Sequence, residues 1–381
     1  MSARLKSLLF FSVAATLAIV SVWQSLSWRS SWQIVTEQVT IDAAQAPEFS
    51  KSFIFEQETV ASVHASAIVS VRNNELLAVW YGGTREGSGD VAIYGSKKGA
   101  DSAWSIPEVL IGREKLAQDT GRHIKKLGNP VLLSDGSKTV WMFFVSTSIG
   151  GWSTSAVNLV ISHDAGQTWG RAKRLITSPF LNLSTLVKAR PFFYQDGSIG
   201  LPAYHELAGK FSELLRVSPD GTVLDKVRIT HGRYTIQPSI VALNEDHLIT
   251  MMRNTNTVRK VVRSYGAKAG KIWSEADYSE LPNPNAAVSI AGDKDLLVIA
   301  YNDLKDDRNQ LALAVSTDRG LSWNKRFQLE SSGADEDGVK SEFSYPYLYP
   351  TKNGEFHLVY TWQRKRIAYV YFNRSWLEQQ P

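Results

Sequence analysis

Residues 161–169 read ISHDAGQTW and residues 315–323 read VSTDRGLSW, two copies of the pattern Ser-x-Asp-x-Gly-x-Thr/Ser-Trp. Asp and Gly build tight turns between strands, and the Trp is placed to pack back under the turn. Degenerate copies, GSKKGADSAW, SPDG and SYGAKAGKIW, begin at residues 95, 218 and 264. A turn that recurs along the chain in this way indicates a repeated β architecture.

A second repeat, two apolar runs joined by a short polar turn, alternates with the turn motif. Six copies begin at residues 64, 128, 189, 236, 284 and 344, and intervals of roughly 45 to 65 residues are typical of propeller blades. Four copies carry proline at the start of the first run, where a strand tolerates it; these are Pro130, Pro191, Pro238 and Pro346. The sequence therefore predicts an all-β, six-bladed β-propeller over residues 51–381.

The N-terminal region has a different character. Residues 8–23, LLFFSVAATLAIVSVW, carry no charge and come after Arg4 and Lys6, and apolar residues continue to Trp28. Their length lies between a signal-peptide core and a transmembrane helix, and the preceding positive charge favours export of the downstream chain. We expect residues 1–30 to be a signal peptide or signal anchor and residues 31–50 a linker. The protein is then held in the inner membrane facing the periplasm or outside, or is periplasmic or secreted if the segment is cleaved.

Composition narrows the classes of function. The chain has 381 residues, 21% of them charged, which argues against disorder. The net charge of +5 comes without a lysine-rich tract or an aromatic–basic ladder, so no nucleic-acid partner is expected and the basic bias suits an anionic ligand. The absence of cysteine excludes disulfides and thiol nucleophiles. We expect no cofactor, no metal site and a monomer. The acidic residues 335–337 are expected to form a solvated loop, with a calcium-binding loop as the alternative.

These motifs resemble the Asp-box (BNR-repeat) superfamily of sialidases from about residue 50 onward. In particular, WYGGTREG, LGNPV, GLPAYHE, LPNPNAAV, EFSYPYL and YTWQRKRI are similar to the predicted bacterial neuraminidases. The resemblance implies that the Asp-boxes are structural and lie opposite the active site, so Asp164 and Asp318 are not catalytic. It also implies a glycosidase in which three arginines bind the substrate carboxylate and a Tyr–Glu pair supplies the nucleophile.

Only some of the family's site residues have a clear counterpart in this sequence. Tyr345 matches the nucleophile, and Arg253 and Arg308 match two of the three arginines. Glu86 and Asp90 both lie in the blade-one loop where the resemblance places the acid/base, and spacing does not choose between them.

Two positions depart from the family pattern. His-Ala-Ser-Ala at residues 64–67 replaces the Arg-Ile-Pro motif that supplies the first arginine, and Gln237 stands where the Glu partner of the nucleophile is expected. An amide cannot act as a base, so Glu342 or Glu206 is the candidate replacement. The resemblance implies a terminal acidic, sialic-acid-like sugar, and the two departures weaken the case for sialic acid itself.

The repeat places the openings of the first strands, the loops after the second strands and the interblade loops on one face. Arg190 is a candidate third member of the carboxylate clamp, with backbone carbonyls as its alternative partners. In the competing interpretation Tyr345 packs on the axis, the arginines form ion pairs and the histidines make structural hydrogen bonds. The candidate substrate-binding residues are His64, His123, Asn129, Arg190, His205, Gln237, Arg253, Asn285 and Arg308.

The sequence supports three hypotheses for the function. The first is a sialidase-like exo-glycosidase acting on an acidic glycan. The second is a polysaccharide lyase or a histidine-led glycosidase on the same scaffold, favoured by the histidines and by the missing Glu. The third is a non-catalytic glycan-binding propeller in envelope polysaccharide assembly.

Overall fold

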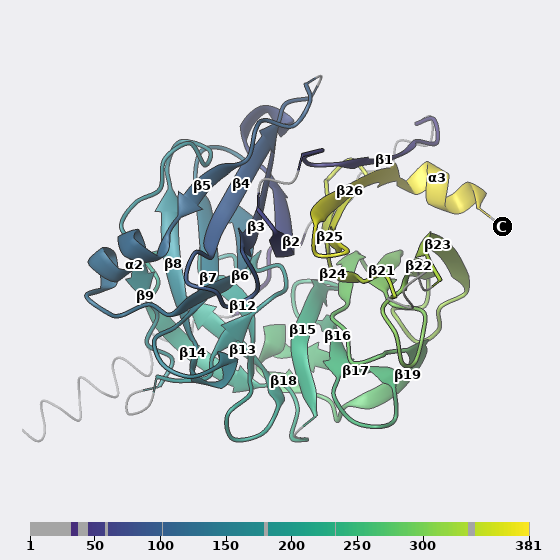
Figure 1. The fold of residues 1–381 in the computed structure, drawn as a ribbon. Coiled ribbons are helices and arrows are strands. Elements are labelled where there is room, and N and C mark those ends of the chain that lie inside the picture. Colours follow the sequence, from purple (N-terminus) through teal and green to yellow (C-terminus); the bar gives the residue numbers. More distant parts are fainter. Residues whose placement is uncertain are drawn as a thin grey trace, which may run out of the picture.

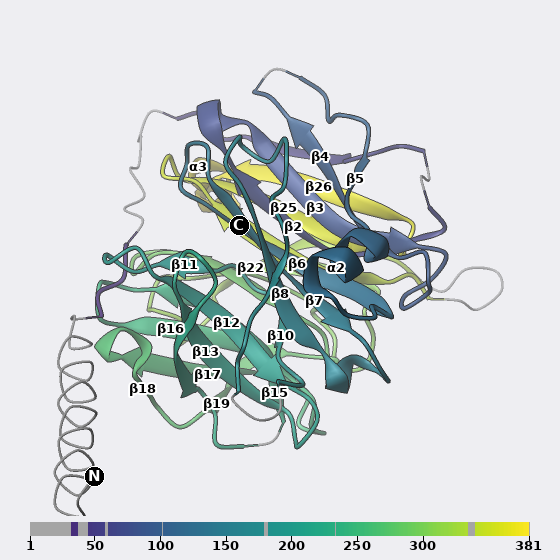
Figure 2. The ribbon, with the colours of Figure 1, turned by 90° about the vertical axis from the view of Figure 1, so that its left-hand side faces the viewer.

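A computed structural model describes residues 32–36, 45–57, 60–100, 102–178, 182–232, 234–333 and 340–380. Six antiparallel sheets are arranged around a common axis (Figures 1 and 2). The predicted all-β, six-bladed propeller is therefore confirmed. The apolar run at residues 8–23 lies outside the described residues.

Each blade is an antiparallel sheet in which most of the paired strands follow one another in the sequence. Blade one contains β2 (Ser62–Ser70), β3 (Leu76–Gly83), β4 (Ala92–Lys98) and β5 (Glu108–Ile111). Blade two contains β6 (Lys126–Ser134), β7 (Val140–Thr147), β8 (Ala156–Ser162) and β9 (Lys173–Arg174). Blade three contains β10 (Leu186–Val187), β11 (Phe192–Phe193), β12 (Ile199–His205), β13 (Phe211–Val217) and β14 (Val223–Arg228).

The second half of the ring repeats this arrangement. Blade four contains β15 (Thr235–Ala242), β16 (Leu248–Asn254), β17 (Lys260–Ala267), β18 (Ile272–Trp273) and β19 (Asp277–Pro282). Blade five contains β20 (Ser289–Gly292), β21 (Leu297–Tyr301), β22 (Gln310–Ser316) and β23 (Lys325–Ser331). Blade six contains β24 (Phe343–Pro350), β25 (Glu355–Trp362), β26 (Arg366–Asn373) and β1 (Phe49–Phe53).

The ring closes through its two ends. Strand β1 pairs antiparallel with β26 (Figure 1). The register sets Phe49 opposite Phe372 and Phe53 opposite Ala368. The outermost strand of the last blade thus comes from the N-terminal side of the chain. Every edge backbone group that β1 covers would otherwise be an unpaired donor or acceptor.

Helices are few and peripheral in the described part of the chain. They are α2 (Arg113–Thr120), α3 (Arg374–Gln379) and the short 3₁₀ turns η1 (Arg72–Asn74), η2 (Trp152–Thr154) and η3 (Lys268–Gly270). Among these elements none is both long and apolar enough to cross a membrane.

The Asp-box turns lie at the end of the propeller where the innermost hairpins also turn. In blade two, the Oδ1 atom of Asp164 accepts hydrogen bonds from the backbone N–H groups of Gln167 and Thr168 at 3.0 and 2.8 Å. The next residue, Ala165, donates its N–H to the carbonyl of Lys138 in the innermost turn at 2.8 Å. We call this end of the propeller the Asp-box face, and the opposite end the site face.

A β-bulge interrupts the innermost strand in four blades, just below the site face. The register of β2, β6, β15 and β24 shifts at this point. The first bulged residue has a left-handed backbone, and these residues are Ala65, Asn129, Gln237 and Tyr345, with φ of 50°, 46°, 54° and 56°. Bulges re-aim side chains beside active sites. Non-glycine residues in this conformation carry strain of about 1–2 kcal/mol.

Residues 32–36, which we expected to belong to a linker, pack on the propeller. We call them the strap. Trp32 and Ile34 are buried, and Ile34 forms a β-bridge with Tyr194 of blade three.

Candidate active site

The bulged residues of different blades converge on the axis at the site face. The hydroxyl oxygen of Tyr345 accepts a hydrogen bond from Nε2 of Gln237 at 3.4 Å. Gln237 also donates to the hydroxyl of Tyr204 at 3.4 Å, and Nδ2 of Asn129 donates to the same hydroxyl at 3.2 Å. Amide side chains thus form a polar floor under the tyrosine hydroxyls.

Two arginines lie beside this floor. Arg253, near the end of β16, donates through Nη1 to the Tyr345 hydroxyl at 3.4 Å and through Nε to Oδ1 of Asn285 at 2.7 Å. Arg308 donates through Nη2 to the carbonyl of Asn285 at 2.7 Å. Burial, and then the nearby charge of Arg253, lower the pKa of Arg308. The two guanidinium groups therefore concentrate positive charge next to Tyr345.

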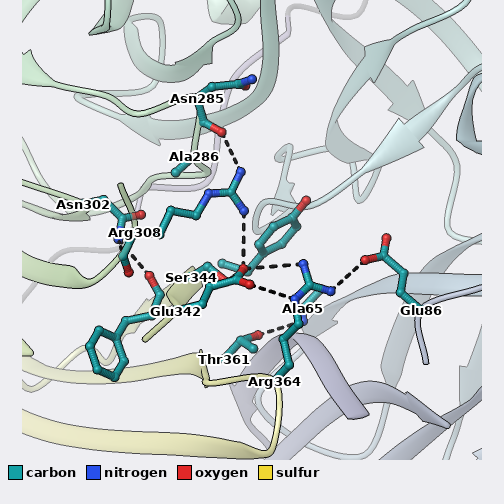
Figure 3. A network of polar contacts seen from close by, with 12 residues as sticks. Ala65, Glu86, Asn285, Ala286, Asn302, Arg308, Glu342, Ser344, Thr361 and Arg364 are labelled. Carbon is teal, nitrogen blue, oxygen red and sulfur yellow. Dashed lines mark hydrogen bonds and ion pairs between the residues drawn. The ribbon is translucent and has the colours of Figure 1, made fainter. Parts of the chain in front are cut away.

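A third arginine, Arg364, connects two carboxylates (Figure 3). Its Nε lies 2.8 Å from Oε2 of Glu342, and its Nη1 lies 2.9 Å from Oε2 of Glu86. The indole N–H of Trp152 donates to Oε1 of Glu86 at 3.0 Å, and Arg308 lies 3.4 Å from Oε1 of Glu342. Sequence reasoning missed Arg364, although it stands in the QRKR loop after the second strand of blade six, among those assigned to this face.

The pKa values of both carboxyl groups are lowered. Burial opposes ionisation of Glu342, but hydrogen bonds from Arg364 and Ser344 outweigh it and lower the pKa to about 2. Burial likewise opposes ionisation of Glu86, and Arg364 again lowers the net pKa. Glu342 was a candidate partner of the nucleophile, but its hydrogen bonds go to arginines and to Ser344 rather than to the Tyr345 hydroxyl.

The structure separates the two acid/base candidates of blade one. Glu86 joins the Arg364 network, with about a third of its side chain (35%) exposed. Asp90 is exposed and accepts hydrogen bonds from the backbone N–H and the hydroxyl of Thr84 at 2.8 and 2.7 Å. Asp90 therefore holds its own loop together, and Glu86 is the carboxylate that faces the cluster.

His64 and Lys188 pack against the ring of Tyr345. The His64 ring centroid lies 4.2 Å from that of Tyr345, and burial, followed by the charge of Arg364, lowers the pKa of His64 to about 3. The Nζ atom of Lys188 lies 5.6 Å from the Tyr345 centroid and donates to the carbonyl of Pro346 at 3.2 Å. Burial lowers the pKa of Lys188 to about 7. Sequence reasoning did not select Lys188.

The sequence places Arg190 at the start of the innermost strand of blade three, on the site face. This placement is wrong. The innermost strand of this blade is split into β10 and β11, and residues 188–191 between them carry no ladder pairing. This displacement sets Lys188 beside Tyr345. Arg190 instead lines a cavity of about 70 Å³ with Phe192 and Tyr349 near the Asp-box face, so it does not join the other arginines.

Two predicted histidines also lie apart from the cluster. His123 is exposed in the connection between α2 and β6. The ring of His205 stacks on Phe211 at a centroid distance of 4.9 Å, and burial, followed by the charges of Lys226 and Arg228, lowers its pKa. Its environment is the outer part of blade three rather than the axis.

The described residues contain no group of three or more His, Cys, Asp or Glu side chains that suits a metal ion. The acidic residues 335–337 lie outside the described residues.

An Asp-box propeller with a tyrosine–arginine cluster at the opposite end defines a sialidase-like protein. Residues 74–358 match the model of the BNR repeat-like domain. The match spans more than half of the chain, and the chain belongs to this family. No curated protein matches the sequence.

Solved sialidase structures share the fold. The Hadza microbial sialidase Hz136 has 16% sequence identity and a TM-score of 0.68 over 83% of this chain and 66% of its own. The NanB sialidase of Streptococcus pneumoniae has 10% identity and a TM-score of 0.66 over 85% of this chain and 70% of its own. The Trypanosoma rangeli sialidase in complex with the inhibitor DANA has 12% identity and a TM-score of 0.66 over 88% and 61%. This chain thus spans 66% of the Hadza protein and 61% of the T. rangeli one, and at these identities the likeness shows the fold alone.

Proposed function

We propose that this chain is an exo-glycosidase that hydrolyses a terminal acidic, sialic-acid-like sugar from a surface or extracellular glycan. The observation that carries the proposal is the position of Arg253. Among the described residues no carboxylate forms an ion pair with it, yet it hydrogen-bonds the Tyr345 hydroxyl and neighbours Arg308. A substrate carboxylate would supply that anion, with the geometry that guanidinium groups favour.

The same cluster supports a two-step hydrolysis. The Tyr345 hydroxyl loses its proton to water, and its oxygen attacks the anomeric carbon. The glycosidic bond breaks with its electron pair on the leaving oxygen, which Glu86 protonates. Water then attacks the anomeric carbon, gives a proton to Glu86, and releases Tyr345, which recovers its own proton.

Arg364 couples substrate binding to the protonation of Glu86. Before substrate binds, Arg364 holds Glu86 as a carboxylate. A substrate carboxylate that engages Arg364 withdraws this cation from Glu86, and a carboxyl group that loses its cation gains proton affinity. Glu86 is then suited to act as the acid.

The test is turnover of an aryl sialoside by the Tyr345→Phe variant, with Tyr265→Phe as a matched control. Tyr265 lies towards the Asp-box face and bonds the carbonyl of Arg319 at 3.2 Å. We expect Tyr345→Phe to lower kcat by roughly a thousandfold or more, because a covalent nucleophile is removed, and Tyr265→Phe to leave it unchanged. Acidic glycans that bind without turnover, and equally well to Tyr345→Phe, would instead support a non-catalytic propeller.

The contact of His64 with Tyr345 favours a second candidate, β-elimination from a uronic-acid polysaccharide. Burial keeps the His64 ring neutral, with its Nδ1 atom lacking a hydrogen-bond partner among the described residues. In this reaction His64 takes the proton beside the uronate carboxylate, a C=C bond forms, and the leaving oxygen departs with a proton from Tyr345. Ultraviolet absorbance of the unsaturated product distinguishes elimination from hydrolysis.

We also propose that residues 8–23 direct export and attach the chain to a membrane. Their uncharged composition after Arg4 and Lys6 supports this location. Membrane fractionation of the full chain, with and without residues 1–30, tests it: loss of membrane retention only in the shortened chain is the expected result.

A further inference from the structure

The strap, residues 32–36, forms sheet-like contacts with blades three and four. The N–H of Ile34 donates to the carbonyl of Glu245 at 3.0 Å, and Ile34 bridges to Tyr194. Trp32 is only 7% exposed and Ile34 is fully buried. These contacts fix where the chain arrives on the propeller.

Trp32 is held by two cations. The Arg216 guanidinium lies 4.6 Å from its ring centroid, and Nζ of Lys271 lies 4.7 Å away. Tyr194 packs edge-on at 5.4 Å. Each cation–π contact stabilises the docked ring by about 0.5–2 kcal/mol, so the strap is an integral part of the folded propeller.

The strap docks on the Asp-box face. Glu245 lies in the turn before β16, whereas Arg253 lies near the other end of that strand. At about 3.3 Å per residue, β16 separates the strap from the arginine cluster by roughly 20 Å. The attachment point and the candidate active site are therefore at opposite ends of the molecule.

The connection to the apolar run is short. Apolar residues continue to Trp28, and the strap begins at Trp32. Four extended residues reach at most about 14 Å, and the nine residues from position 23 reach about 32 Å. Strands of eight or nine residues make a disc about 30 Å thick. The four-residue connection from Trp28 is too short to cross that thickness, and the nine-residue connection from position 23 could cross it only if it were fully extended along the side of the disc.

We propose that the Asp-box face lies against a phospholipid bilayer and that the site face points away from it. This inference rests on the proposed membrane attachment by residues 8–23. Val35 and Ile272 are 46% and 51% exposed on the Asp-box face and provide apolar contact with the lipid interface.

The orientation limits the substrate. A sugar carried on a short headgroup of the same bilayer cannot reach the arginine cluster, because the thickness of the propeller intervenes. The acidic glycan must approach from the distal side, as a soluble chain or on a facing surface.

The natural absence of cysteine permits a direct test. Lys294→Cys places the only thiol at the exposed innermost turn of blade five on the Asp-box face, and Arg85→Cys places it in the exposed blade-one loop at the site face. The full-length chain is reconstituted into phosphatidylcholine–phosphatidylglycerol vesicles that contain an acceptor-labelled lipid, and externally exposed thiols are labelled with a donor dye. We expect much stronger energy transfer from position 294 than from position 85.

Release of the strap supplies the control. Trp32→Ala removes both cation–π contacts, and we expect the difference between the two positions to shrink while near-ultraviolet circular dichroism stays native. If that variant does not fold, the comparison of positions 294 and 85 alone remains decisive. Equal transfer from both, stronger transfer from position 85, or failure of the full chain to float with vesicles overturns the proposal. Tyr345→Phe leaves the transfer unchanged, so an inactive enzyme and a wrong orientation are distinguishable.

Discussion

The Nη1 atom of Arg253 lies 3.4 Å from the hydroxyl oxygen of Tyr345. This contact brings a cation from blade four to a tyrosine from blade six, and neither side chain has a carboxylate partner among the described residues. A negatively charged substrate would therefore meet the proposed nucleophile, Tyr345, and the positive charge of Arg253 together.

Arg253→Lys keeps the positive charge but loses the planar guanidinium group, which can donate two parallel hydrogen bonds to a carboxylate. We expect KM for an anionic glycoside to rise roughly 10- to 100-fold, with a smaller change in kcat, since a bidentate, charge-assisted contact is lost. Steady-state kinetics on a sialoside and on its carboxylate-reduced analogue measure the effect. The analogue should show little difference between the variant and the parent, and an equal loss on both substrates would contradict carboxylate binding. Arg72→Lys at the innermost turn of blade one is the matched control.

Glu86→Gln tests the acid role through the leaving group. A general acid matters most when the leaving oxygen is a poor one, so we expect a loss of about 10²–10⁴-fold on an alkyl glycoside and a much smaller loss on an aryl glycoside. Asp90→Asn weakens the hydrogen bonds that hold the same loop together. We expect it to change both rates only by the amount that this loss of loop stability causes. The reverse pattern would assign the role to Asp90.

Lys188 gives the protein a pH-dependent stability. Its pKa is about 7 in the folded chain and near 10.4 when exposed in the unfolded chain. The unfolded state therefore binds more protons between these values, and stability rises with pH across this window. Below pH 7 the buried ammonium group lowers the free energy of unfolding by its full amount, a few kcal/mol.

Lys188→Met removes this cost. We expect Tm to rise at pH 6 and to change little at pH 10, as measured by calorimetry, because the ammonium has no carboxylate partner to lose among the described residues. Lys352→Met, an exposed change, should leave Tm unaltered at both pH values. A lower Tm at pH 6 would show that the cation stabilises the fold through the rings of Tyr345 and Tyr347.

Ala65→Gly should stabilise the propeller by up to about 1 kcal/mol. Ala65 has φ of 50°, a conformation that costs a residue with a Cβ about 1–2 kcal/mol, partly offset by the greater freedom of glycine in the unfolded chain. Urea denaturation measures the change. Ala67 lies two residues further along the same strand, where the backbone is paired with β3, and Ala67→Gly should be destabilising. A similar loss of stability for both variants would show that the backbone at Ala65 is not strained.

The repeats were sufficient to predict the blades, because turn residues and apolar runs report local strand geometry. The openings of the innermost strands also identified Tyr345, Gln237, Asn129 and Asn285, whose left-handed backbones aim them at the axis. Arg190 escaped this reasoning because Pro191 mimics the other openings. The innermost strand of blade three is divided into β10 and β11, and this division places Lys188 beside Tyr345. No pattern in the sequence indicates the division.

Arg364 escaped for a different reason. The resemblance directed attention to blade one for the first arginine, whereas here a loop of blade six reaches across the closure of the ring to Glu86. The contact joins residues 278 positions apart in sequence, and no local pattern reports such a distance.

The pairing of β1 with β26 has a consequence for biosynthesis. Residues 49–53 are made before blades one to five and find their partners only in residues 368–372, which follow those blades in the sequence. Blades one to five can form while translation continues, but the circle stays open until residues 368–372 have left the ribosome. A nascent chain in this open state keeps a long edge available for mispairing. Export as an unfolded chain would avoid that interval, because β1 and β26 would then both be available while the six blades assemble on the far side of the membrane.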